Sequence, residues 1–232
     1  MVNPLPALTA VLCLAVSGCA STTAGTAMPA APIPPTTAET LPALLLSAPD
    51  VAAALGAGEL VVTGDVGAPW NDATHFQAAG ETGCLAIAGA AQKSVYADAG
   101  WSALRGQVLR EPPTSRQWSH FATQAVVLFQ DDGAAAGFLG AQRQSWGGCS
   151  DRELRYAQQP APDQRWAVGP TSADRDLLTV SREQRGPQHW FCQRALTVHA
   201  NVGVDVEACS LDGPTSAAAA IADRIADRLP SA

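Results

Sequence analysis

The sequence is poor in positive charge, and nearly all of that charge comes from arginine. The 232 residues contain 14 Lys and Arg against 21 Asp and Glu, a formal net charge of −7, and Lys93 is the first basic residue. Proteins that bind nucleic acids present a clustered basic surface. The composition therefore argues against DNA or RNA as a partner.

Spacings that mark metal or nucleophile chemistry are also missing. No Cys-x-x-Cys, His-x-x-x-His or Gly-x-Ser-x-Gly pattern occurs, although such patterns mark many zinc sites and the serine elbow of hydrolases. We expect all four histidines on the surface or in loops, namely His75, His120, His189 and His199. Adjacent side chains diverge on a strand, so Ser119 and His120 should not act together. The sequence predicts no catalytic residue, cofactor or bound metal.

Only the first residues contain an apolar run that suggests contact with a membrane. Residues 5–16 are largely apolar and lead into Ser17-Gly18-Cys19, the layout of an export signal. A cysteine directly after small residues resembles a bacterial lipobox, which implies cleavage before Cys19 and lipid, palmitate included, on its thiol. The run is shorter than the roughly 20 residues that a spanning helix needs. The start departs from a usual signal because it carries no basic residue.

The organisation that follows is a signal, a tether and one domain. We expect residues 1–18 to be a lipoprotein signal peptide. Residues 19–40 are rich in Ala, Thr and Pro, a composition too polar to form a core, and should tether the lipid to the domain. Residues 41–232 have the length of one globular domain. The mature protein would lie on the outer face of the cell membrane, held by lipid alone.

Hydrophobic periodicity and turn residues predict an α+β fold, with an antiparallel sheet and helices packed on it. We expect helices at both ends of the domain and one in the middle, with strands between them. The helices are expected within 41–55, from Asp131 to about Trp146, and from Pro214 to Leu229; the strands over 59–66, 101–110, 121–129, 153–158, 165–169 and 176–182, followed by a hairpin over 192–209.

The four cysteines of the domain predict two disulfides, because exported cysteines are normally oxidised. Four cysteines allow three pairings. Pairing Cys192 with Cys209 centres a hairpin between Ala200 and Asn201 and sets Arg194 opposite Glu207, a favourable cross-strand pair. A four-residue loop over 199–202 would avoid the positive φ angles of a two-residue turn. Locality thus favours 192 with 209, which leaves Cys84 to pair with Cys149.

Tryptophan is frequent relative to the other aromatic residues, with six Trp against two Tyr and five Phe. Trp146 and Trp190 stand close to cysteines, which suits packing against the disulfides. Trp101 and Trp118 flank an apolar strand region, and an aromatic wall with a nearby arginine would suit a sugar or an amphipathic molecule. Trp101, Trp118 and Arg194 are therefore the candidate ligand-binding residues, although an ion pair with Glu207 is the simpler role for Arg194.

Several stretches together resemble the PknH-like extracellular domain of mycobacteria, which forms the sensor part of a receptor kinase and also occurs alone in envelope lipoproteins. The matching stretches are LLLSAPDVAAALG (44–56), VYADAGWSALRGQVLRE (95–111), QAVVLFQDDGAAAGFL (124–139), SWGGC (145–149) and CQRALTVHANVGVDVEAC (192–209). The resemblance implies an α+β fold with a prominent cleft, disulfides 84–149 and 192–209, and a ligand-sensing role. Kinase motifs are missing from the sequence, so phosphorylation is not carried over.

Two functions remain, with an envelope hydrolase a distant third. The first is a non-catalytic module that binds or senses an envelope small molecule or peptide in a concave, Trp-lined pocket. The second is a lipoprotein that docks another envelope protein through a flat apolar patch and binds no small ligand.

Overall fold

A computed structural model of the chain describes residues 36–70, 79–115, 117–157, 160 and 162–230. The expected signal peptide, Cys19 and His75 lie outside the described residues. In the part of the chain that is described, no helix combines the length and apolarity needed to cross a membrane.

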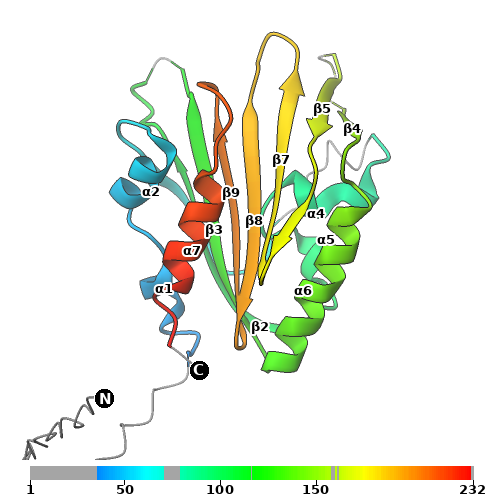
Figure 1. Cartoon of the computed structure of the whole chain (residues 1–232). Helices are drawn as coiled ribbons and strands as arrows, with labels where there is room; N and C mark the ends of the chain where they lie inside the picture. Colours follow the sequence, from blue (N-terminus) through cyan, green and yellow to red (C-terminus); the bar gives the residue numbers. More distant parts are fainter. Residues whose placement is uncertain (1–35, 71–78, 116, 158–159, 161, 231–232) are drawn as a thin grey trace, which may run out of the picture. The chain divides into compact units, whose positions relative to one another are not determined.

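An antiparallel sheet of nine strands is the centre of the described domain (Figure 1). The order across the sheet is β1-β2-β3-β9-β8-β7-β5-β4, and β6 pairs with β7. The strands are β1 (Val61–Val66), β2 (Trp101–Arg110), β3 (His120–Phe129), β4 (Glu153–Tyr156), β5 (Gln164–Val168), β6 (Ser172–Asp174), β7 (Leu177–Arg185), β8 (Phe191–His199) and β9 (Val202–Ser210).

Helices cover both faces of this sheet (Figure 1). One face carries α1 (Leu41–Leu44), α2 (Ala48–Leu55) and α7 (Ala217–Ala226); the other carries α4 (Leu85–Ala88), α5 (Lys93–Tyr96) and α6 (Asp132–Gly147), with the short 3-10 turn Thr82–Cys84 before α4. The expected α+β class, an antiparallel sheet with helices packed on it, is confirmed.

Local sequence signals explain where the longer helices begin and end. The Ser47 side chain accepts a hydrogen bond from the Asp50 amide at the start of α2, and Gly56 ends that helix with φ +69°. A left-handed residue at a helix C-terminus favours glycine because it lacks a Cβ. At the start of α6 the Asp131 side chain accepts from the Ala134 amide at 2.8 Å. The cap of α6 at Asp131 lies where the sequence predicts that helix to begin.

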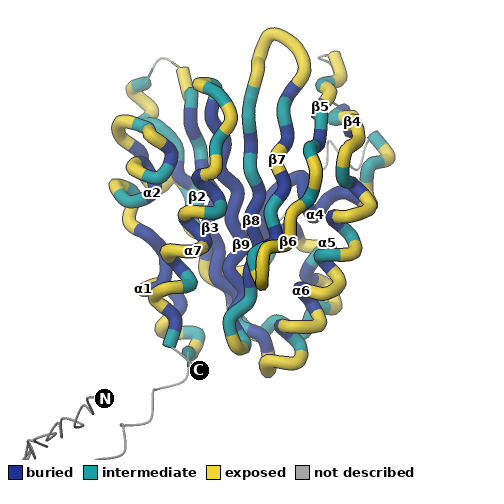
Figure 2. The backbone as a smooth tube through the Cα atoms, viewed as in Figure 1, coloured by how far each residue is buried: buried dark blue, intermediate teal, exposed yellow. Residues whose placement is uncertain are grey.

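The central strands are mostly buried (Figure 2), and alternation along them gives the sheet two cores, one on each face. On β3, Val126 packs with the α1, α2 and α7 side, while Val127 packs with the α4 and α6 side. Most of β3 and β9 is buried, and polar side chains of these strands such as Gln124, Asp205 and Glu207 are buried with the apolar ones. Few polar side chains on these two strands are therefore in contact with water.

The β8–β9 hairpin has the expected register but a shorter loop. Cys192 faces Cys209 and Arg194 faces Glu207, as predicted, yet His199 pairs directly with Val202. The expected four-residue loop is therefore wrong: Ala200 and Asn201 form a two-residue turn, with Ala200 at φ +49°. The turn is tied to the end of β3, because the Phe129 amide donates to the Asn201 carbonyl at 2.8 Å.

Other differences from the expected elements are small. β7 continues to Arg185, three residues past its expected end, and β6 and the short helices α4 and α5 were not predicted. Both disulfides are confirmed: Cys84–Cys149 joins residues 65 apart, and Cys192–Cys209 joins residues 17 apart.

Candidate functional site

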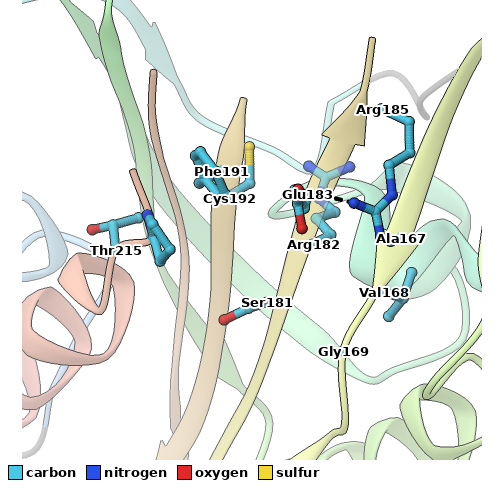
Figure 3. A pocket seen from close by; sticks show the side chains of 11 residues that line it. Ala167, Val168, Gly169, Ser181, Arg182, Glu183, Arg185, Phe191, Cys192 and Thr215 are labelled. Atoms are coloured by element: carbon cyan, nitrogen blue, oxygen red, sulfur yellow. Dashed lines mark hydrogen bonds and ion pairs between the residues drawn. The ribbon is translucent and has the colours of Figure 1, made fainter. Parts of the chain in front are cut away.

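A groove lies on the α7 side of the sheet, over β5, β7 and the start of β8 (Figure 3). Its volume is about 350 Å³. The residues that line it are Ala167, Val168, Gly169, Ser181, Arg182, Glu183, Arg185, Phe191, Cys192, Pro214 and Thr215. The helix α7 packs on β8 and β9, and beyond it the same face of β7 carries exposed residues. Unlike the expected Trp-lined pocket, this groove has no tryptophan among its lining residues.

Alternation along β7 determines which of its side chains face the groove. On β7, Ser181, Glu183 and Arg185 are exposed or half-buried, while Arg182 between them is buried on the opposite face. Glu183 faces Phe191 across the β7–β8 ladder, so a carboxylate and an aromatic ring share the floor of the groove. The predicted strand ended at residue 182, so this pattern was missed. The alternation of buried and more exposed residues continues to Arg185.

Charge in the groove is concentrated at Glu183. Its Oε1 lies 2.5 Å from the His189 Nε2 atom and 3.0 Å from the Arg185 Nη1 atom. The hydrogen bond from His189 and the charge of Arg185 together hold the pKa of Glu183 below its usual value. The ring of His189 lies 4.6 Å from that of Phe191. The groove therefore offers a carboxylate, a guanidinium and an aromatic face within a few residues.

Directly behind the groove, the other face of the sheet holds a buried charge cluster formed by Arg182, Arg194, Asp205 and Glu207. All four side chains are at least nine-tenths inaccessible to solvent. Arg182 is ion-paired with Glu207, and the Arg194 Nη2 atom lies 2.7 Å from the Asp205 Oδ1 atom. The expected ion pair between Arg194 and Glu207 is therefore wrong, although these residues do face each other, because the carboxylate two positions along β9 lies within reach.

Asp205 also bonds to residues outside this cluster. Its Oδ2 atom accepts from the Ala91 amide at 2.7 Å and from the Tyr96 hydroxyl at 3.0 Å. Burial, and next the Asp205 charge, raise the pKa of Tyr96 well above its usual value, so Tyr96 stays protonated and donates. Arg194 also donates to the Ala86 carbonyl at 3.1 Å. The cluster thereby ties the segment around α4 and α5 to the centre of the sheet.

The structure separates the three expected ligand residues. Trp101 is half-buried at the first position of β2, facing Phe129, whereas Trp118 is 44% exposed in the loop before β3, near the other end of the β2–β3 ladder. Arg194 is 2% exposed and lies beneath the centre of the sheet, with its guanidinium 5.3 Å from the Trp146 ring. Of the three, Trp118 lines a described hollow.

The expectation that every histidine lies on the surface or in a loop is wrong for His120. This residue is 6% exposed on β3, with Nδ1 3.0 Å from a Glu111 oxygen and Nε2 3.2 Å from an Asp212 oxygen. Glu111 Oε1 also accepts from the Ser119 hydroxyl at 3.2 Å, so Ser119 and His120 share one carboxylate. Carboxylates from two other segments lower the cost of burying the imidazole.

Glu111 is expected to make the domain sensitive to acid. Burial raises the pKa of Glu111, but hydrogen bonds from His120 and from backbone amides outweigh it, and the pKa lies below its usual value. A depressed folded pKa adds stability above the unfolded pKa that is lost as the pH falls through the folded pKa. Glu111→Gln should lower the free energy of unfolding by about 1–2 kcal/mol at neutral pH.

Urea denaturation of Glu111→Gln and the parent protein between neutral pH and pH 3 would measure this difference. The gap between the two proteins should shrink as the pH falls below the ordinary range of a glutamate. A gap that is constant over the whole pH range would contradict the role assigned to the Glu111 carboxylate. Glu153→Gln, on a half-exposed side chain that lies 3.7 Å from Arg165, serves as the control and should change little.

One group of metal-ligand types gathers among the described residues, formed by Cys192, Glu207 and Cys209. Both sulfur atoms belong to the same disulfide. A disulfide sulfur lacks the thiolate charge with which cysteine binds zinc. In its oxidised form this group does not offer a thiolate metal site.

Fold and site together define a disulfide-bonded α+β domain with a groove on its sheet. The chain belongs to the PknH-like extracellular domain family, whose model matches residues 36–228. It is similar to the extracellular domain of PknH from Mycobacterium tuberculosis in its crystal structure, with a TM-score of 0.74 and 28% identity over 84% of this chain and 97% of that one.

Among full-length proteins, the chain is similar to the serine/threonine-protein kinase PknH. It is 29% identical to the Mycobacterium bovis protein over 98% of this chain, and 30% identical to the Mycobacterium tuberculosis protein (strain CDC 1551) over 87% of it. The matches cover 38% and 31% of those kinases. The chain thus spans about a third of the length of these relatives, and the shared part is the extracellular domain.

Proposed function

We propose that this protein is a non-catalytic binding module of the cell envelope, which captures a small polar molecule or a short peptide in the groove over β5, β7 and β8. The observation that carries the proposal is the groove itself: a hollow of about 350 Å³ on the sheet, in a family of extracellular domains. Ligand sites are typically concave, mainly apolar and furnished with a few polar groups.

The groove chemistry favours a ligand that carries both signs of charge. Glu183 and Arg185 stand side by side at 3.0 Å and could each bind a ligand group of opposite charge. Phe191 supplies an aromatic face, and Pro214 and Thr215 form the wall on the α7 side. A peptide, an amino acid or a similar zwitterion would satisfy all three features.

The membrane attachment belongs to the same proposal. Residues 1–18 would act as the signal peptide, Cys19 would carry the lipid, and residues 20–40 would tether the domain to the outer face of the cell membrane. Intact mass measurement of the mature protein tests this directly. A mass that includes residues 1–18, or an unmodified Cys19, would refute the anchor and leave the groove untouched.

Docking of another envelope protein is supported less well by the surface. Protein-binding patches are contiguous and apolar over several hundred Å². Within the described residues, the exposed large hydrophobic side chains are Val62 and Trp118. Two isolated residues do not make such a patch, so we favour the small ligand.

Filling the groove with a large side chain tests the proposal. Ser181→Trp places an indole on the groove floor at an exposed position of β7, and should abolish ligand capture without unfolding the domain. The matched control is Ser102→Trp, at an exposed position of β2, which is separated from β7 by the strands β3, β9 and β8. Native mass spectrometry of proteins purified from their own envelope should show a bound compound in the parent and the control, and none in Ser181→Trp.

Two results would overturn the proposal. One is a parent protein that carries no compound and whose melting temperature envelope extracts leave unchanged. The other is Ser181→Trp retaining the compound as fully as the control does, because the ligand would then lie elsewhere.

A further inference from the structure

A second hollow lies at the end of the sheet where β3 begins and β9 ends, and it is distinct from the groove. It has a volume of about 390 Å³. Three segments supply its described lining: the loop before β3, the β7–β8 loop and the residue after β9. These residues are Ser115, Gln117, Trp118, Gln188, Trp190 and Leu211. None of them lines the groove.

Two tryptophan rings dominate this Trp hollow. Trp118 is 44% exposed, an unusual position for so large an apolar ring. Trp190 is half-buried and packs edge-on against Phe121, with 5.5 Å between ring centroids. The Arg110 guanidinium lies 4.2 Å from the centroid of the Trp118 ring, an arrangement that stabilises the ring on that side. Each indole therefore has a packing partner outside the lining, Arg110 for Trp118 and Phe121 for Trp190.

Hydrogen bonds hold the two residues that follow Trp118. The Glu111 carboxylate accepts from the amides of Ser119 and His120, each at about 3.2–3.3 Å. The Leu211 amide donates to the Ser119 carbonyl at 2.8 Å, which joins this loop to the end of β9. Preorganised side chains lose less entropy on binding, and these hydrogen bonds restrict the backbone directly after Trp118 before a ligand binds.

The chemistry of the described lining selects for a neutral ligand. It contains two indoles, two primary amides, a hydroxyl and a leucine, and no ionisable side chain. Amides and hydroxyls both donate and accept hydrogen bonds, as the hydroxyl groups of a sugar require. Indole faces offer a flat apolar surface against the C–H groups of a pyranose or furanose ring. A charged ligand would find no counter-charge among these six residues.

We propose that the Trp hollow is a second binding site, and that it takes a neutral saccharide stacked on Trp118 with its hydroxyl groups bound by Gln117 and Gln188. None of its described lining residues belongs to the groove. Because the site is open and small, it holds one or two sugar units of a longer glycan. We expect its affinity for a short oligosaccharide to be in the millimolar range.

Titration with the neutral trisaccharides maltotriose, mannotriose and N,N′,N″-triacetylchitotriose tests the proposal, with the indole N–H resonances of isotope-labelled protein as the readout. At least one of them should shift the Trp118 and Trp190 resonances and leave that of the buried Trp146 unchanged. Trp118→Ala should weaken this binding tenfold or more, and Gln188→Ala severalfold. Both side chains are exposed, so the melting temperature should stay close to that of the parent.

Ser181→Trp, which fills the groove, is the matched control and should bind the same trisaccharide as the parent does, so failure of one site is distinguishable from failure of the other. Three results would overturn the proposal: no resonance shift with any of the three sugars, equal binding by Trp118→Ala and the parent, or stronger binding of a uronic-acid or amino-sugar trisaccharide than of its neutral counterpart. The last result would show that the site selects for charge.

Discussion

Replacing Asp205 with asparagine is expected to lower the free energy of unfolding by about 3–5 kcal/mol, the usual effect of removing one partner of a buried ion pair. Asparagine has almost the same shape and keeps an oxygen for the Ala91 amide and the Tyr96 hydroxyl. What it removes is the negative charge opposite Arg194, whose side chain is 2% exposed. The guanidinium would remain buried beside Trp146 without a counter-ion.

Urea denaturation followed by circular dichroism would measure the effect, and Asp98→Asn is the matched control because Asp98 is exposed close to Tyr96. A second variant separates charge from packing. Replacing Arg194 with methionine in the Asp205→Asn background removes the unpaired charge, so the double variant should be more stable than Asp205→Asn alone. An Asp205→Asn protein as stable as the control would show that the ion pair adds nothing to stability.

The sequence predicts those parts of the fold that local rules determine. The caps at Ser47, Gly56 and Asp131 follow from side-chain chemistry within one helical turn. The register of the β8–β9 hairpin follows from pairing Cys192 with Cys209, since one fixed pair sets every other pair along two antiparallel strands. These features needed no information from distant segments.

Contacts between distant segments explain where the predictions failed. Arg194 pairs with Asp205 because Glu207 is already paired with Arg182, a residue of β7. His120 is buried because Glu111 and Asp212 come from other segments to meet it. The two-residue turn at Ala200 is held by Phe129, at the end of β3. In each case the deciding partner belongs to a different strand or loop.

The residues of the candidate sites also divide into those that the sequence pointed to and those that only contacts between segments bring together. Trp118 was a candidate from the sequence because it flanks an apolar strand region, and it does line a hollow. Its neighbour in that hollow, Trp190, had been assigned to disulfide packing, because the sequence shows its distance from Cys192 and not its distance from Trp118. Glu183 and Phe191 carried no motif, and only the pairing of β7 with β8 brings them together.

The disulfides are expected to differ in their effect on stability, with Cys84–Cys149 the more important of the two. In the chain-entropy model, closing a loop of 65 residues stabilises the fold by about 4 kcal/mol and closing one of 17 residues by about 3 kcal/mol. Local structure reinforces the order. Cys192 and Cys209 lie on strands already joined along a ladder of nine residue pairs, whereas Cys84 and Cys149 join the short turn before α4 to the end of α6.

Paired Cys→Ala variants, one for each bridge, would measure this difference by urea denaturation under non-reducing conditions. Removing Cys192–Cys209 should leave a folded domain, because the strands keep their hydrogen bonds on both sides. Removing Cys84–Cys149 should lower the unfolding free energy by about 1 kcal/mol more, the difference between the two loop entropies. Equal effects would mean that the α4 segment is held mainly by Asp205 of β9, which binds the Ala91 amide and the Tyr96 hydroxyl. Combining Asp205→Asn with the loss of Cys84–Cys149 should then detach that segment from the sheet.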